Sequence, residues 1–415
     1  MTKKMKSVAD VSLCHKIKLV PPIIGEIVAP LELIFTVMNI METAIKRHTL
    51  AVLLCFALVG CERTEQVWPT ADFLDNSIHI SIDTLELTKI QLDSIYCSGI
   101  GVSGIKDGGI ICYYDYYLGY LSSFSLNGTF IKRELGIGNG PHEVVIKHPL
   151  GCYISPRGDL VLIGSNLDIQ SLSYNGGQKY FTIPYRPDLN SGGASFSTYS
   201  FAEDANVKVL DDLLFVSMYS EHPNFNMFAS TNVYLSEANH IGRINLHKHT
   251  TDMIALGFPH AYRENPYLLF SFAQTRFDLY TDKKILVSFE GTPELYVCDR
   301  NGTPIKTFGV PGKDMDQDYL PVRSFEEIEN YIINRSNKGY YADVTILDDY
   351  IFRSYRKGNH TQSDGLQIYK NEVLIADVDV PKGLYVTGKS GKIYVSNAFF
   401  NEDTERLYCY EFEIE

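Results

Sequence analysis

The sequence predicts an all-β fold, a six-bladed β-propeller closed by N-terminal strands. A recurring turn motif and the paired alternating strands before each copy predict it. Residues 125–132 (Ser-Leu-Asn-Gly-Thr-Phe-Ile-Lys) and 299–306 (Asp-Arg-Asn-Gly-Thr-Pro-Ile-Lys) are two copies, and residues 174–177 begin a third. Because Asn-Gly readily adopts positive φ angles, we expect each copy to form a hairpin with a two-residue type I′ turn.

The strand pairs define a repeating unit of four antiparallel strands. Strand–turn–strand patterns stand at 154–163, 279–288, 344–352 and 386–395. Such a sheet cannot bury both of its faces alone, so units of this kind stack radially into a propeller. The expected blades are residues 100–140, 150–187, 205–247, 272–312, 340–380 and 383–415. A seven-bladed ring would need more strands.

Closure of the ring is expected to involve the N-terminal strands. The last unit is short of strands, while residues 78–83 and 85–88 alternate and have no unit of their own. We predict that both complete the sixth blade, since ring closure pairs sheet edges that would otherwise invite aggregation.

One helix is expected. Residues 325–335 have helical spacing, Ser324 is placed to cap them, and Glu327 completes a capping box. We interpret this segment as a surface helix inserted between blades four and five.

The N-terminal region predicts secretion and anchoring. A basic patch at residues 46–48 precedes an apolar run at 50–58, the layout of a secretion signal. That run is too short to cross a hydrocarbon core of about 30 Å. Leu58-Val59-Gly60-Cys61 resembles the lipobox of bacterial lipoproteins, in which the cysteine is acylated and becomes the N-terminus. We therefore interpret residues 1–37 as an over-extended start, 38–60 as a lipoprotein signal peptide, 61–75 as a tether and 76–415 as the propeller domain.

The charge balance argues against nucleic acid as a partner. Without residues 1–60, which hold seven Lys/Arg and four Asp/Glu, the chain keeps 30 basic and 46 acidic residues and a formal charge of −16. Nucleic-acid binding depends on neutralising phosphates with Lys and Arg. The acidic balance favours a soluble, self-repelling surface instead.

A glycine-rich segment follows the first predicted blade. Residues 136–143 read Gly-Ile-Gly-Asn-Gly-Pro-His-Glu. They resemble the Gly-x-Gly-Pro-Gly-Glu segment of the six-bladed, TolB-like propeller lipoproteins of Bacteroidetes, with His142 where that family usually has glycine. Residues 309–314 look like a degenerate second copy. The resemblance implies the propeller fold and an outer-membrane lipoprotein of the cell envelope, facing the periplasm or the outside, and it supplies no catalytic residues.

This segment is also the candidate binding element. Consecutive glycine amides can form an anion nest, which makes the candidate residues Gly138, Asn139, Gly140, His142 and Glu143. A rigid connection between blades that needs positive φ explains the glycines equally well. His142 and Glu143 are adjacent, and adjacent residues rarely converge on one proton.

No complete catalytic or metal-binding set is found. Five cysteines remain besides Cys61, never as Cys-x-x-Cys, and Cys112, Cys298 and Cys409 sit among β-forming residues as small buried hydrophobes. His247 and His249 with Asp252 make at most half of a metal site, so we predict no metal and no cofactor. The acids mostly flank turns, where Asp is favoured; they include Asp107, Asp115, Asp168, Asp211, Asp212, Asp278, Asp343, Asp348 and Asp349.

The expected function is that of a membrane-anchored ligand-binding or protein-interaction module, more a binder than an enzyme. Long loops at residues 187–204, 220–232 and 312–340 are expected to line one face and hold a small molecule, a glycan or a protein. The tyrosine cluster at residues 113–120 suits sugar rings, although tyrosine is also a favoured strand residue. The alternative is a propeller hydrolase or lyase acting on glycans, with acids or a His-bound metal at the axial mouth; a glycosidase would need two carboxylates there.

Overall fold

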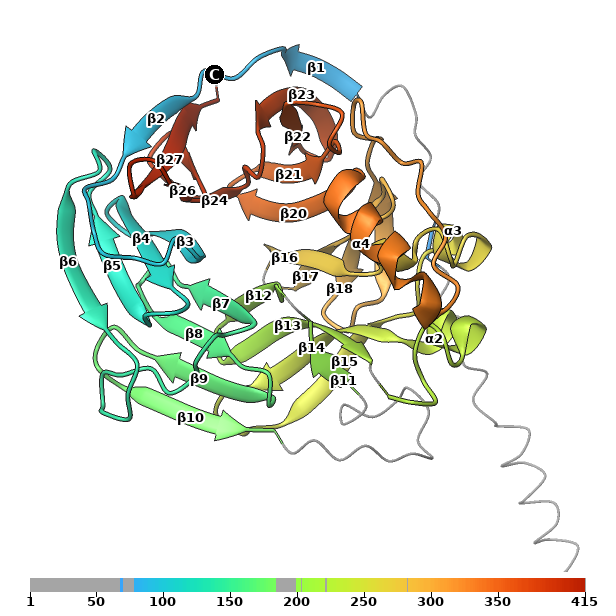
Figure 1. Ribbon diagram of the computed structural model, residues 1–415, viewed down its shortest axis with the longest axis horizontal. Coiled ribbons are helices and arrows are strands. Elements are labelled where there is room, and N and C mark those ends of the chain that lie inside the picture. Colours follow the sequence, from blue (N-terminus) through green and yellow to red (C-terminus); the bar gives the residue numbers. More distant parts are fainter. Residues whose placement is uncertain are drawn as a thin grey trace, which may run out of the picture. The chain divides into compact units, whose positions relative to one another are not determined.

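Six small, mainly antiparallel sheets stand in a ring and form a six-bladed β-propeller, as predicted (Figure 1). The computed structural model describes residues 68–69, 78–183 and 199–414, except 203, 221 and 282. Residues 1–37, the signal peptide, Cys61 and most of the 61–75 tether therefore lie outside the described residues. Among those described, no helix has the length and apolar character needed to cross a bilayer.

The blades follow one another along the chain. Blade one consists of β3 (Gly101–Lys106), β4 (Ile110–Asp115), β5 (Tyr120–Phe124) and β6 (Phe130–Leu135). Blade two consists of β7 (Gly151–Ile154), β8 (Leu160–Ile163), β9 (Asp168–Leu172) and β10 (Gln178–Thr182). Blade three consists of β12 (Val207–Leu210), β13 (Leu213–Ser220), β14 (Asn239–Asn245) and β15 (Thr251–Leu256), with β11 (Tyr199–Phe201) beside the end of β13.

The remaining blades complete the circle. Blade four consists of β16 (Thr275–Thr281), β17 (Lys284–Phe289), β18 (Leu295–Asp299) and β19 (Pro304–Phe308). Blade five consists of β20 (Tyr340–Leu347), β21 (Tyr350–Arg356), β22 (Ser363–Lys370) and β23 (Val373–Pro381). Blade six consists of β24 (Val386–Ser390), β25 (Ile393–Ser396) and β27 (Arg406–Glu413), with β26 (Phe399–Asn401) also paired to β27.

Only one of the two N-terminal strands closes the ring. β2 (Thr88–Gln91) pairs antiparallel with β27 and becomes the outer strand of blade six, with Ile90 opposite Cys409. β1 (Ile78–Ile82) instead runs parallel to β23 as a fifth strand of blade five. The prediction that residues 78–83 and 85–88 both complete blade six was therefore wrong for the first, and the second strand begins three residues later than predicted. The long strand β23 offers an outer edge to the chain before it reaches blade six, so that edge is paired as well.

The Asn-Gly hairpins differ from the predicted turn type. In the copy at residues 125–129, Gly128 N donates to Ser125 O (2.9 Å) and Ser125 N to Thr129 O (2.9 Å). Gly128 has a φ of 86°, while Asn127 has no positive φ. The turn is thus a three-residue connection with glycine in the left-handed position, not a type I′ turn. The copies at 173–177 and 299–303 have the same hydrogen bonds.

Helices are confined to insertions. They are α2 (Thr231–Glu237), α3 (His260–Glu264), η3 (Phe270–Phe272), η4 (Phe325–Glu327) and α4 (Ile328–Asn337). The predicted helix lies between blades four and five, but its capping box was wrong. Ser324 Oγ bonds the Glu326 carboxylate, and Glu327 Oε2 accepts from Arg323 N (2.7 Å). Because the first turn is a 3₁₀ turn, the spacing of a capping box does not apply there.

The core lies between neighbouring sheets. Cys112, Cys298 and Cys409 are free thiols with no exposed surface, as predicted. Trp68 is also buried, although it belongs to the segment expected to be a tether. Its Nε1 donates to Gly257 O (3.0 Å), and its ring meets Phe289 edge-on at 5.2 Å. The chain is thus packed against blades three and four at Trp68, before its first strand begins.

Candidate functional site

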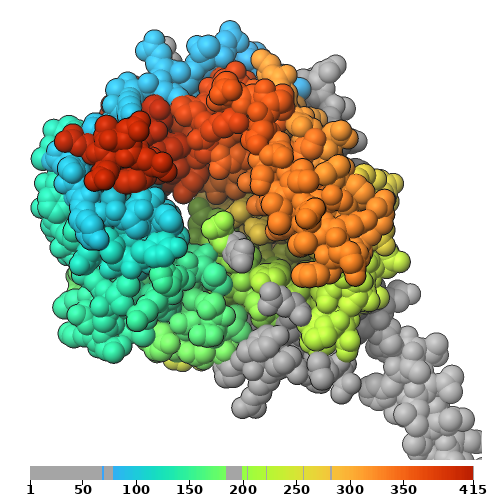
Figure 2. Space-filling view, in the orientation of Figure 1, coloured from blue at the N-terminus to red at the C-terminus, as the bar shows by residue number. Residues whose placement is uncertain are grey.

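A cavity of about 450 Å³ occupies the centre of the ring, where the space-filling view is hollowed (Figure 2). Its wall is built from the innermost strands β3, β7, β12, β16, β20 and β24, and Arg335 of α4 adds to it. The first residues of β3, β7, β12, β20 and β24 and the second residue of β16 are among the lining residues. The cavity therefore lies towards the face on which these strands begin.

Small residues let the inner strands come close to one another at the axis. A Cβ on Gly151 would stand 2.6 Å from Ala205 O, the backbone of the next blade. In turn, Ala205 N donates to Leu150 O (2.9 Å) and joins blades two and three beside the cavity. Only glycine allows this approach.

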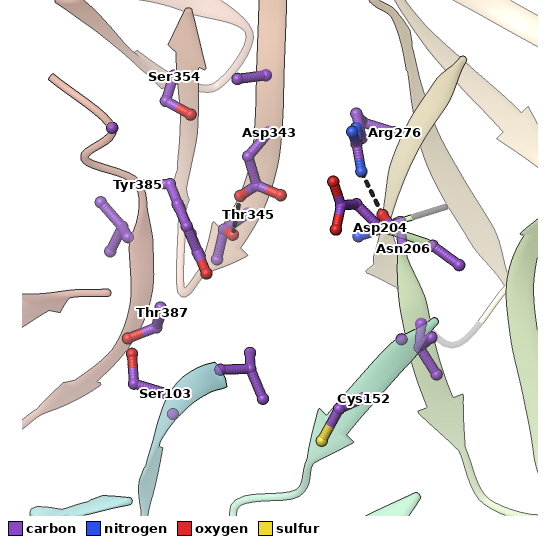
Figure 3. A pocket seen from close by; sticks show the side chains of 18 of the residues that line it. Ser103, Cys152, Asp204, Asn206, Arg276, Asp343, Thr345, Ser354, Tyr385 and Thr387 are labelled. Carbon is purple, nitrogen blue, oxygen red and sulfur yellow. Dashed lines mark hydrogen bonds between the residues drawn. The ribbon is translucent and has the colours of Figure 1, made fainter. Parts of the chain in front are cut away.

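Two carboxylates project into the cavity from different blades. Asp343 comes from β20 in blade five, and Asp204 precedes β12 in blade three (Figure 3). Thr345 Oγ1 donates to Asp343 Oδ2 (3.0 Å). Burial raises the pKa of Asp343, and the nearby Lys208 and Arg276 cations only partly oppose this. Its carboxyl group is therefore easier to protonate than an exposed one.

The cations of the wall are already paired with protein carboxylates. Lys208 Nζ lies 3.1 Å from Asp278 Oδ2, and Arg276 Nη2 lies 3.0 Å from Glu290 Oε1. Glu290, whose side chain has no exposed surface, also pairs with Arg335. These pairs neutralise most of the positive charge, because a buried charge is retained only with a partner.

Several hydroxyl groups complete the wall. Tyr116 and Tyr385 line it, and burial raises the pKa of both phenols, so they stay protonated and can donate or accept hydrogen bonds. Ser354 Oγ is buried and has no hydrogen-bond partner among the described residues. Burial also raises the pKa of the Cys152 thiol, which argues against a thiolate nucleophile.

The cavity therefore presents acceptors and hydroxyls rather than free cations. Asp204 and Asp343 can accept from hydroxyl or ammonium donors, and the phenols can bond to either partner. No group of three or more His, Cys, Asp or Glu side chains suited to a metal occurs in the described part of the chain.

The predicted loop at residues 136–143 is closed upon itself. Glu143 Oε2 accepts from Gly140 N (2.7 Å), and Gly138 N donates to Val144 O (3.0 Å). A Cβ on Gly138 would stand 1.9 Å from Glu143 Oε2, which explains that glycine. Two of the amides that were to form an anion nest are thus used within the loop.

The loop is also held from the next blade. Gln170 of β9 has no exposed surface; it donates to Glu143 O (2.9 Å) and accepts from Val145 N (2.8 Å). Gln367 of β22 holds the second copy in the same way, through Val310 O (3.1 Å). Both loops therefore have the geometry of rigid connections between blades.

The five candidate binding residues do not line the central cavity. His142 alone among them borders another hollow, of about 770 Å³, along blades one and two. Much of its wall consists of hairpin turns such as residues 156–158 and 173–176. No inner strand converges on it from the opposite side of the ring, so we place the main site at the axis. A binding role for Gly138, Asn139, Gly140, His142 and Glu143 stays a prediction.

Sequence reasoning missed the residues of the cavity. Asp343 was grouped with turn-flanking acids, yet it lies inside β20, and Asp278 lies inside β16. The sequence did contain a signal for these two residues. Each acid stands within an alternating strand pattern and not beside a Gly or Asn turn. Of the predicted loops, Asp204 and Arg335 line the cavity, while residues 187–198 lie outside the described part.

The three residues weighed as half of a metal site have separate partners. His247 Nε2 lies 2.8 Å from Asp212 Oδ1, and the His249 ring stacks on Phe181 at 4.0 Å. Asp252 pairs with Arg243.

Comparison with known proteins supports the fold. The sequence matches no protein-family model and no curated protein. A member of the DUF4221 family from Bacteroides vulgatus ATCC 8482 is similar with a TM-score of 0.56 and 12% identity, over 80% of this chain and 97% of that one.

Two further solved structures are less similar. A candidate exported protein from Bacteroides fragilis NCTC 9343 gives a TM-score of 0.48 and 12% identity, over 81% of this chain and 98% of that one. Virginiamycin B lyase from Staphylococcus aureus gives a TM-score of 0.39 and 11% identity, over 80% of this chain and 89% of that one. At 12% identity, the likeness to the Bacteroides vulgatus protein shows the propeller fold alone.

Proposed function

We propose that this protein is an extracytoplasmic lipoprotein, anchored through Cys61, whose propeller binds a small polar ligand in its central cavity. The observation that carries the proposal is the convergence of Asp204, Asp343 and the phenols of Tyr116 and Tyr385 on one cavity. Its volume of about 450 Å³ falls in the usual range of about 300–1,000 Å³ for ligand sites. Because the cations are paired, the ligand should be rich in donors, such as the hydroxyls of a sugar or an ammonium group.

Calorimetric titration with neutral, amino and carboxylated oligosaccharides tests the cavity. We expect the neutral or amino sugars to bind and Asp343→Asn to weaken binding about 10- to 100-fold, since a buried polar group that loses its hydrogen-bond partner costs about 1–3 kcal/mol. Asp348→Asn is the matched control, because Asp348 pairs with Lys389 at a hairpin turn away from the cavity. Equal affinities in both variants would count against the cavity as the site.

Membrane fractionation tests the anchor. Changing Cys61 to Ser should remove the acyl chains and release the protein from washed membranes. A variant that still sediments with the membranes would show that the anchor is elsewhere.

A second candidate function is hydrolysis or elimination on a glycan. It is favoured by two carboxylates in one cavity, of which Asp343 has a raised pKa, as a general acid requires. Turnover of a bound oligosaccharide, lost in Asp343→Asn while binding persists, would establish an enzyme. If the oligosaccharide binds but no product forms, the protein acts as a binding module and not as an enzyme on that glycan.

A further inference from the structure

Exposed apolar side chains gather on three insertions of the ring. The insertions are residues 222–238, 257–274 and 309–339, which carry the helices and are together called the cap. Eight large apolar side chains of the cap are at least 36% exposed: Phe228, Val233, Tyr267, Leu268, Leu320, Phe325, Ile332 and Ile333. Phe325 is the most exposed of them, at 73%.

Contacts between the insertions make the cap one surface. Phe228 stacks on Phe270 at 4.5 Å, and Phe270 meets Tyr331 of α4 at 6.2 Å. Val322 N donates to Tyr267 O (3.0 Å). In Figure 1, α2, α3 and α4 lie together at one side of the ring.

Strand direction places all three insertions on one face. The first connects the second and third strands of blade three, and the other two connect successive blades. Because antiparallel strands alternate in direction, both kinds of connection emerge on the same face.

The N-terminal segment is packed at this same face. Trp68 bonds to Gly257 O, at the start of the second insertion, and its ring touches Phe289 at the end of β17. Cys61 precedes Trp68 by seven residues, a length of chain that spans at most about 25 Å.

We propose that the apolar surface of the cap docks onto the lipid bilayer that holds Cys61. The inference rests on the proposed anchor. The short chain keeps the cap within reach of the membrane, so docking becomes intramolecular, and a few apolar side chains suffice where they would not hold a free protein.

The charges of the cap favour a zwitterionic surface over an anionic one. Arg323 pairs with Glu327 (3.2 Å), and His260 pairs with Glu264 (3.0 Å). Glu326 and Glu329 add negative charge to the segment that carries Phe325 and Ile332. Docking should therefore depend on apolar insertion and change little with salt.

Tryptophan fluorescence offers a direct test, because the only native tryptophan, Trp68, is buried. The full-length lipidated protein carrying Phe325→Trp is reconstituted into phosphatidylcholine–phosphatidylethanolamine vesicles, with and without brominated acyl chains. The matched control is Tyr174→Trp, which is 62% exposed on the β9–β10 hairpin outside the cap. We expect a blue shift and a loss of emission in brominated vesicles for the cap variant, and neither for the control.

Each other outcome overturns the docking. If the protein floats with the vesicles but the tryptophan at position 325 emits as it does in water, the anchor is supported and the docking is refuted. A blue shift without quenching by bromine indicates a second copy or another protein on the cap. Protein that fails to float refutes the anchor and the docking together, and a control quenched as strongly as the cap variant shows contact without a preferred face.

Discussion

His240 shows how one buried residue couples the fold to pH. Its Nε2–H donates to Gly257 O (2.8 Å), the carbonyl that also accepts from Trp68, and its ring lies edge-on to Phe258 and Phe289. Burial lowers the pKa of His240 to about 4. The folded protein therefore holds the imidazole neutral in an apolar setting.

The pH dependence follows from this shift. The unfolded chain takes up the proton near pH 6.5, while the folded one resists until about pH 4. The stability is therefore fully present above pH 6.5 and is lost as the pH falls towards 4, by up to about 3 kcal/mol. Urea unfolding at pH 7 and 4.5 should show a smaller loss for His240→Gln than for the native protein, and equal losses would contradict this assignment.

Asp278 and Asp343 at the cavity wall show the limit of what residue type conveys. Both are aspartates in the sequence, but one is part of a structural hydrogen-bond network and the other is open to a ligand. Asp278 accepts from Ile346 N (2.8 Å) and pairs with Lys208. Asp343 faces the cavity, and among the described residues only Thr345 donates a hydrogen bond to it. The partners come from other blades, so only the ring decides which acid is left for a ligand.

At the scale of elements, β1 and β2 have unequal roles. Ile90 of β2 is only 6% exposed and lies in the core between blades six and one, while Ile80 of β1 is 45% exposed. β2, from the start of the domain, pairs with β27 at its end and so closes the ring. β1 only covers the outer edge of blade five, which already has four strands.

The same substitution in both strands should therefore give different results. Ile90→Asp places a charge in the core and should lower the free energy of unfolding by about 3 kcal/mol or more, while Ile80→Asp should stay within about 0.5 kcal/mol. Urea denaturation followed by circular dichroism measures both. A large loss for Ile80→Asp would show that β1 closes the ring as well.

At the scale of the whole molecule, each blade is stabilised by its neighbours. One core cluster extends over blades two, three and four. The N-terminal strand β2 pairs with β27 and so holds the last blade. A ring of sheets that bury their faces on one another should lose its structure as one unit.

The cooperativity of unfolding can be measured with two probes that report different parts of the ring. Trp68 fluorescence reports blades three and four, and circular dichroism reports all six. In urea both signals should share one midpoint, and Ile90→Asp in blade six should shift both equally. Separate midpoints would mean that blades unfold independently.

The sequence by itself determined the strands, the six-fold repeat and the inserted helix, because alternation and turn residues act over a few neighbours. It also indicated that Cys112, Cys298 and Cys409 are buried. The place of β1, the burial of Trp68 and the group around Asp343 were decided only by the tertiary structure. Each of these depends on residues that are distant along the chain and are brought together when the ring closes, and no local pattern records such contacts.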